Sequence, residues 1–124
     1  MGLALILEGK VFNIWAMTHE NRCPVKEFID RLETSDQRKV IALFDRLANH
    51  GILNNEEKFH KLKGKGISIW VFKSFQVRIL CFFDQQRLVI LTHGFKKKGN
   101  EMPKEEIEKA LRFQKEYFKD KENG

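Results

Sequence analysis

The sequence predicts a small α+β domain in which helices pack on a largely antiparallel sheet. Three observations support this fold class. The chain has 124 residues, which is room for one domain spanning 1–124. Apolar residues recur every three to four positions in segments before and after the middle of the chain, as in amphipathic helices. Between them, short runs of β-branched and aromatic residues separated by brief spacers indicate consecutive antiparallel strands.

The N-terminal segment is expected to hold two strands. Residues 11–17 are rich in strand formers, and the apolar run 3–7 suggests an extra strand within residues 1–10. The run is too short for a secretory signal, and no run reaches the roughly 18 apolar residues of a membrane span. We therefore expect a cytoplasmic protein with reduced cysteines and no membrane partner.

Two helices should follow. Pro24 is suited to the first turn of a helix, because its missing N–H would have no partner there. Thr34 and Gln37 have the spacing of a capping box, which predicts that Thr34 caps the second helix. Gly51 is then expected to end this helix. The apolar faces of both helices are assigned to the core.

Three strands and a last helix complete the prediction. The strands are expected at 67–73, 76–83 and 88–92, and the helix from Pro103 to about Lys119, with 119–124 as a frayed tail. We expect the helices to cover one face of the sheet. The other face, together with the loops at its ends, would then carry the basic residues.

The positive charge of the chain is concentrated in its centre. The net charge is +6, but residues 58–98 alone hold ten basic residues and one acid, for a net charge of +9. The flanking segments 1–57 and 99–124 carry −2 and −1. Most charge runs form a solvated face, but this concentration favours a surface that contacts phosphates.

Several enzyme motifs are absent from the sequence. It has no glycine-rich phosphate loop, no zinc-protease motif, no nucleophile elbow and no dinucleotide fingerprint. The four histidines show no metal-ligand spacing. We therefore expect neither a metal nor a cofactor.

A series of short motifs runs through the basic stretch and into the last helix. In order they are FHKLKG at 59–64, WVFK at 70–73, VRIL at 77–80, HGFKKK at 93–98 and PKEEIEKA at 103–110. In this order and spacing they resemble the RelE/ParE superfamily of toxins from bacterial toxin–antitoxin pairs, and most closely its phage-related, HigB-like branch. The resemblance covers roughly residues 11–118 and implies a RelE-like domain.

The resemblance also implies a function. Family members of this kind are ribosome-dependent mRNA endonucleases, or mRNA interferases, that inhibit translation and are held in check by a cognate antitoxin. We therefore expect a metal-independent endoribonuclease whose partners are the ribosome, mRNA and a small helix-turn-helix antitoxin. Two alternatives stay open. One is a ParE-like toxin that binds a protein such as DNA gyrase, and the other is a non-catalytic RNA-binding module.

The candidate site residues are the charged and titratable side chains of these motifs. Arg78 can hold a phosphate through two parallel hydrogen bonds, and Lys61 and Lys63 would project from the same side of an extended segment. The catalytic candidates are Lys61, Lys63, Lys73, Arg78, His60 and His93. The candidates for binding nucleic acid are Lys58, Lys65, Lys96, Lys97 and Lys98.

The aromatic residues of the centre have two interpretations. Three of them, Phe59, Trp70 and Phe75, lie among the basic residues, where a ring could stack on an unpaired base. For Trp70 core packing is favoured. The side chains expected in the core are Trp15, Phe72, Phe82, Phe83 and Cys81.

Overall fold

Six strands and three helices build the domain. The computed structural model describes residues 1–52 and 55–123. The elements are β1 (Gly2–Glu8), β2 (Asn13–Thr18), α1 (Pro24–Asp30), α2 (Thr34–His50), β3 (Phe59–Lys61), β4 (Trp70–Ser74), β5 (Val77–Asp84), β6 (Leu88–Lys96) and α3 (Lys104–Asn123). The strands form one sheet in the order β1-β2-β6-β5-β4-β3. Only the β2–β6 pair is parallel, which confirms the predicted α+β class.

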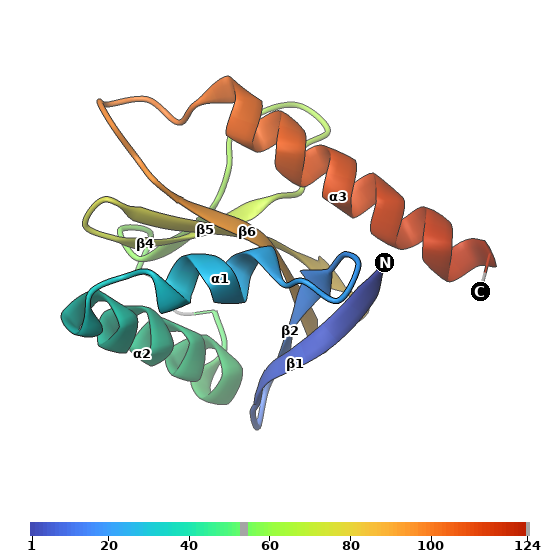
Figure 1. Cartoon of the computed structure of the whole chain (residues 1–124), viewed down its shortest axis with the longest axis horizontal. Coiled ribbons are helices and arrows are strands. Elements are labelled where there is room, and N and C mark those ends of the chain that lie inside the picture. The colour runs from blue at the N-terminus through green and yellow to red at the C-terminus, as the bar shows by residue number, and fades with distance from the viewer. Residues whose placement is uncertain (53–54, 124) are drawn as a thin grey trace.

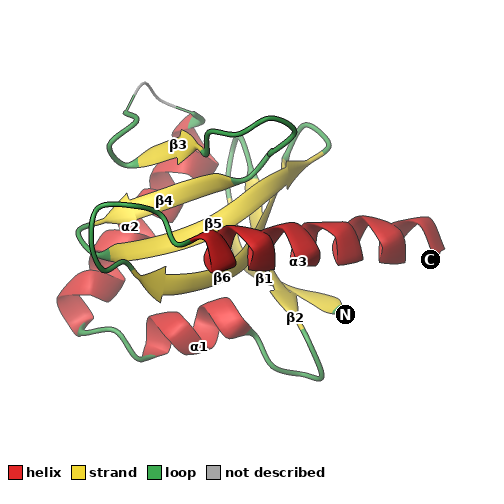
Figure 2. Ribbon diagram, turned by 90° about the horizontal axis from the view of Figure 1, so that it is seen from above, coloured by secondary structure: helices red, strands yellow, loops and turns green. Residues whose placement is uncertain are grey.

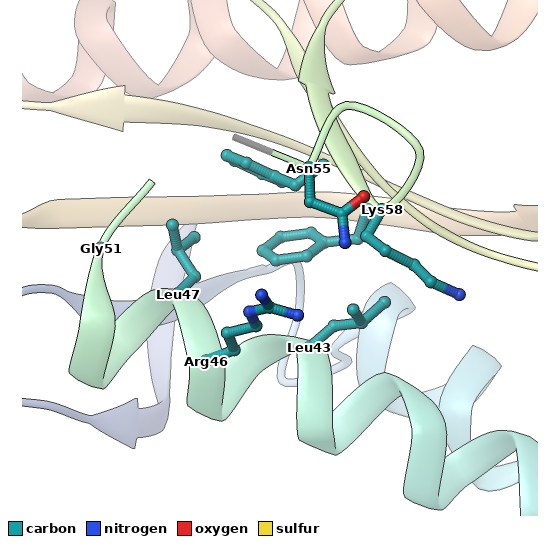
Figure 3. A pocket seen from close by; sticks show the side chains of 8 residues that line it. Leu43, Arg46, Leu47, Gly51, Asn55 and Lys58 are labelled. Atoms are coloured by element: carbon teal, nitrogen blue, oxygen red, sulfur yellow. The ribbon is translucent and has the colours of Figure 1, made fainter. Parts of the chain in front are cut away.

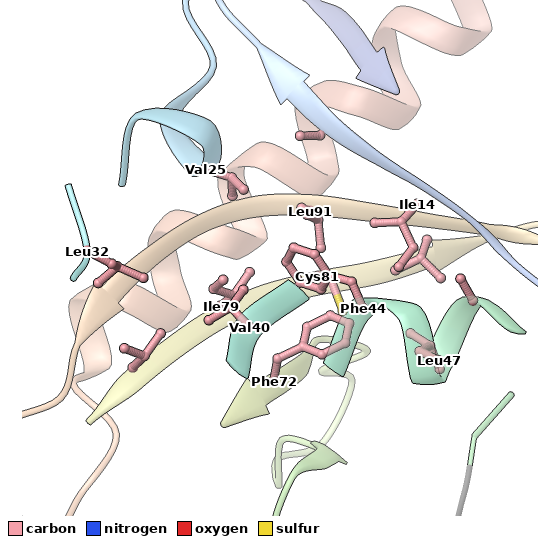
Figure 4. Close-up of a cluster of buried hydrophobic side chains, with 14 residues drawn as sticks. Ile14, Val25, Leu32, Val40, Phe44, Leu47, Phe72, Ile79, Cys81 and Leu91 are labelled. Carbon is pink, nitrogen blue, oxygen red and sulfur yellow. The ribbon is translucent and has the colours of Figure 1, made fainter. Parts of the chain in front are cut away.

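Helices cover both faces of the sheet, so the prediction of a single covered face is wrong. Figure 1 shows α1 and α2 on one side of the sheet and α3 on the other. On β5, Ile79 and Cys81 point into the core beneath α1 and α2, which Figure 4 shows, whereas Leu80 and Phe82 point into a second core beneath α3. Strands that are apolar on both faces need cover on both. The continuous apolar runs of β5 and β6 therefore explain the position of α3.

The strands agree with the prediction in kind and differ in length. β1 is the expected extra strand and pairs antiparallel with β2. β4, β5 and β6 pair consecutively and antiparallel, as predicted, but β6 continues to Lys96. The three-residue strand β3 at the sheet edge was not predicted, since so short a run shows no alternation. At the other end of the chain, residues 119–123 continue α3 instead of forming a frayed tail.

The prediction for the C-terminal end of α2 is confirmed, and the prediction for its N-terminal end is wrong. Gly51 ends α2 with a φ of +80°, a conformation that glycine adopts at little cost. The capping box does not form, because Glu33 occupies the N-cap position and Thr34 is already helical. Gln37 instead donates its side-chain N–H to the carbonyl of Ile29, 2.9 Å away. Its side chain therefore ties α2 to α1.

A buried carboxylate anchors α3 to the sheet. Tyr117 Oη donates to Asp84 Oδ2 at 2.6 Å, and Lys121 Nζ donates to the same oxygen at 2.8 Å. Burial alone would raise the pKa of Asp84, but the bonds from Lys121 and Tyr117 outweigh it and hold the pKa below its usual value. The one acid of the central stretch is therefore engaged by α3.

The predicted core residues are confirmed. Phe72, Phe82 and Cys81 are buried, and Trp15 and Phe83 pack against the two cores. In the described part of the chain, no helix has the length and apolar character to cross a membrane.

Candidate nucleic-acid interface

Three candidate residues share the face of the sheet on which α3 lies. Lys73 on β4 and Arg78 on β5 are directly opposite each other, and His60 on β3 opposes Val71. Since side chains alternate along a strand, all three project to the same side as Val71 and Leu80 of the second core. α3 packs mainly over β5 and β6, and Figure 2 shows β3 and β4 extending beyond it.

His60 has the geometry of a base. Its Nδ1 lies 3.1 Å from the carbonyl oxygen of Glu56. A carbonyl only accepts, so Nδ1 carries the proton and Nε2 has a free lone pair. Partial burial lowers the pKa of His60, and the positive charges of Lys73 and, more weakly, Arg78 lower it further. The imidazole is therefore neutral at pH 7 and can accept a proton.

Arg78 is buried and partly engaged by the neighbouring turn. Its Nη1 donates to the carbonyls of Phe75 and Val77, the latter at 2.9 Å. Burial lowers the pKa of Arg78, yet a guanidinium stays charged at neutral pH. Within the described residues Nη1 makes both of its hydrogen bonds. No hydrogen bond among the described residues uses the edge formed by Nε and Nη2, which can bind a phosphate with two bonds.

Lys61 and Lys63 line an open hollow at the β3 edge of the sheet. His60 and Trp70 also contribute to the wall of this hollow. The Trp70 ring stacks on Phe59, with centroids 5.1 Å apart. Because Lys61 opposes Trp70, it projects to the face opposite that of His60. The structure thus places both lysines near His60, at the β3 edge of the sheet. Lys73 and Arg78 lie around this edge from them.

The remaining basic candidates extend this region along β3 and β4. At one end, the Lys58 carbonyl accepts a bond from Lys73 N, and Lys97 N donates to Gln76 O at the β4–β5 turn. Lys65 lies at the other end, in the loop between β3 and β4. We call the whole set the basic band, consisting of Lys58, Lys61, Lys63, Lys65, Lys73, Arg78, Lys96, Lys97 and Lys98. Within residues 1–52 and 55–123, none of the ion pairs includes a member of this band.

A family comparison adds to this geometry. Residues 27–115 match the family model described as Phage derived protein Gp49-like (DUF891). The chain belongs to this Gp49-like family. The matched segment contains the whole basic band, and membership is consistent with a toxin-like protein. No curated protein matches the chain.

His93 occupies a different environment from the other candidates of this Gp49-like protein. It is 2% exposed and lies beneath α3, with Nε2 3.4 Å from Glu106 Oε1. Burial lowers its pKa to about 4, and the charges of Lys109 and Arg112 add to the effect. Its burial argues against direct proton exchange with a bound RNA.

Arg87 belongs to the basic stretch of the sequence but lies apart from the band. Its guanidinium donates to the carbonyls of Lys10 and Val11, beside the N-terminal hairpin. The net charge of the stretch thus overstates the charge available on one surface. The described residues also contain no group of three His, Cys, Asp or Glu side chains placed to hold a metal.

An apolar hollow lies beside the basic band, between α2 and the sheet. Leu43, Leu47 and Phe72 form its walls. Figure 3 shows Arg46 and Lys58 at its rim, with the Lys58 chain extending away from it. Because its walls are apolar, this hollow is not suited to a phosphate.

The structure brings two further residues to the band. Phe75, at the tip of the β4–β5 turn, is 72% exposed, and Lys39 Nζ of α2 lies 4.1 Å from the centre of its ring. Phe75 was one of three aromatic candidates in the sequence. Lys39 lies outside the basic stretch, and no spacing pattern connects it to the band.

Proposed function

We propose that this chain is a toxin-like, metal-independent endoribonuclease that cuts ribosome-bound mRNA and is restrained by a cognate antitoxin. The observation that carries the proposal is the grouping on one face of a neutral His60 with the cations Lys73 and Arg78. The basic band around them lacks carboxylate partners among the described residues, so its charge can attract an RNA backbone. Family membership supports the toxin-like character of the proposal.

The proposed reaction uses the RNA's own 2′-hydroxyl as the nucleophile. His60 Nε2 takes the proton of this hydroxyl, whose oxygen then attacks the adjacent phosphorus. Lys73 and the free edge of Arg78 stabilise the negative charge of the phosphorane. Lys61 or Lys63, reaching the same phosphate from around the β3 edge, protonates the 5′-oxygen as the P–O bond breaks. The products are a 2′,3′-cyclic phosphate and a 5′-hydroxyl end.

A non-catalytic RNA-binding module is the second candidate. The observation that favours it is the engagement of Arg78, whose Nη1 is bound to two carbonyls of the turn. A guanidinium held in this way would mainly stabilise the hairpin, and its contact with phosphate would be secondary. In that case the band would bind RNA without cutting it.

Mapping of mRNA 5′ ends after induced expression tests the proposal. We expect codon-positioned cuts that disappear in Arg78→Ala, in the double variant Lys61→Ala/Lys63→Ala and in His60→Ala. His60→Ala should still bind RNA, because it removes the base and leaves the cations. Lys119→Ala, which removes one exposed charge near the end of α3, should cut like the wild type.

Two results would contradict the nuclease, and a third would contradict the role of His60. Uncut mRNA together with blocked replication would indicate a protein target of the gyrase type. RNA binding without cuts in the wild type would support the binding module. Cuts that persist in His60→Ala would remove His60 from the reaction.

A further inference from the structure

Phe75 is the most exposed of the large apolar side chains in the described part of the chain. At the tip of the β4–β5 turn, 72% of its surface is accessible, whereas the next such residue is Ile52 at 50%. Exposing a whole aromatic ring gives up the stabilisation that burial would provide. The exposed Phe75 ring therefore does not stabilise the fold through burial.

The backbone at Phe75 is also unfavourable. Its φ is +54°, whereas the following residue, Gln76, is not among the residues with positive φ. A two-residue hairpin turn with positive φ at its first central position alone has the pattern of type II′, in which glycine is preferred there. A phenylalanine at this position is strained. Strain that packing does not explain is a reason to look for function.

The turn around Phe75 is held by basic residues. Arg78 Nη1 donates to the Phe75 carbonyl, and Lys97 N donates to the Gln76 carbonyl. Lys39 Nζ lies 4.1 Å from the ring centroid and covers one face of the ring. Residues of β5, of α2 and of the segment after β6 thus contact the turn, and the 72% exposure of Phe75 leaves its ring accessible to a planar partner.

We propose that Phe75 stacks on an unpaired nucleobase of an RNA strand bound along the basic band, an inference that rests on the proposed function. Arg78 binds the Phe75 carbonyl with Nη1 and can hold a phosphate with its other edge, so a base from the same stretch of strand can reach the ring. Single-stranded RNA is bound in this way by cations along the backbone and rings beneath the bases. An anchor for a protein partner would instead lie among apolar neighbours.

Affinity for a short single-stranded RNA, measured at several salt concentrations, tests the inference. Phe75→Leu keeps an apolar side chain and the strained backbone but removes the ring, so we expect about tenfold weaker binding. The slope of affinity against salt should not change, because no phosphate contact is lost. Phe75→Trp should bind at least as tightly as the wild type. Phe75→Gly, which relieves the strain, should bind as weakly as Phe75→Leu.

Two controls separate this inference from the proposed function. Lys73→Ala should lower the salt slope, and an oligomer of abasic nucleotides should bind the wild type and Phe75→Leu equally. If the wild type binds no RNA, the proposed function fails and the inference with it. If the wild type binds with a steep salt slope and Phe75→Leu binds equally well, only the inference is overturned. Normal RNA binding by Phe75→Leu with lost inhibition of translation would overturn it in favour of a protein contact.

Discussion

The His60 imidazole is held between a backbone carbonyl and two cations, and each neighbour affects a different property. The Glu56 carbonyl orients the ring and selects the tautomer, because it can only accept a hydrogen bond and Nδ1 must therefore carry the proton. Partial burial and the charges of Lys73 and Arg78 disfavour the imidazolium. His60 needs both effects to act as a base. The carbonyl leaves the Nε2 lone pair free, and the lowered pKa keeps the ring neutral at physiological pH.

At the scale of this residue we predict a pH profile for RNA cleavage. The rate should fall on acidification, because protonated His60 cannot act as a base, and the midpoint should lie below the ordinary histidine pKa of 6.5. A partially active conservative variant, Lys73→Gln, should move the midpoint upward, since a charge that disfavours the imidazolium is gone. Single-turnover cleavage measured from pH 5 to 8 checks this. Lys119→Ala serves as the control, and an equal upward shift in this variant would contradict the assignment.

At the scale of elements, a polar connection at Asp84 holds the C-terminal part of α3 on the sheet. Asp84 at the end of β5 accepts hydrogen bonds from Tyr117 and Lys121, one helical turn apart on α3. The Asp84 side chain is 7% exposed, but that of Lys121 is 44% exposed. The Tyr117 bond to the buried carboxylate should therefore be the stronger of the two.

This difference predicts the order of two stability effects. Tyr117→Phe should lower the free energy of unfolding by roughly 2 kcal/mol, because it removes a hydrogen bond to a buried charge. Lys121→Ala should lower it by less than about 1 kcal/mol, since water screens this partly exposed ion pair. Urea unfolding followed by circular dichroism measures both. A larger loss in Lys121→Ala than in Tyr117→Phe would contradict this interpretation.

The elements also show which parts of the fold can be predicted from the sequence. The helix that begins at Pro24 and the end of α2 at Gly51 follow from backbone chemistry that acts within a few residues. The parallel pairing of β2 with β6 and the bond from Tyr117 to Asp84 join positions far apart in the chain, and no local pattern records them. Gly94 is an intermediate case. Gly94 belongs to the HGFKKK motif, but only the structure shows why a glycine is needed there. An added Cβ would meet Phe28 of α1.

For the whole molecule, the candidate residues lie in an extended band around one edge of the sheet. The charge count identified the segment of the chain that carries the band, and the structure shows that the pairing of β4 with β5 sets Lys73 directly opposite Arg78. The sequence could not show that Lys61 lies around the edge from them, since β3 was not recognised as a strand. Nor could it show that α3 covers His93, because the partners of an amphipathic helix are set by the whole fold.

The burial of His93 predicts how the stability of the whole protein depends on pH. Its pKa falls to about 4 in the folded state, whereas an exposed histidine titrates near 6.5. Between these values the unfolded chain binds a proton that the folded chain does not. Between about pH 4 and 6.5 this group should therefore make the free energy of unfolding rise with pH, by roughly 3 kcal/mol in total. Above that range its contribution should stay constant.

Urea unfolding at a series of pH values tests this, and the informative quantity is the slope, since any change at a buried site alters the absolute stability. His93→Gln should flatten the rise between about pH 4 and 6.5, because glutamine does not titrate. His50→Gln, at the exposed end of α2, is the matched control and should keep the wild-type slope. An unchanged slope in His93→Gln would mean that Glu106, 3.4 Å from Nε2, stabilises the imidazolium enough to offset its burial.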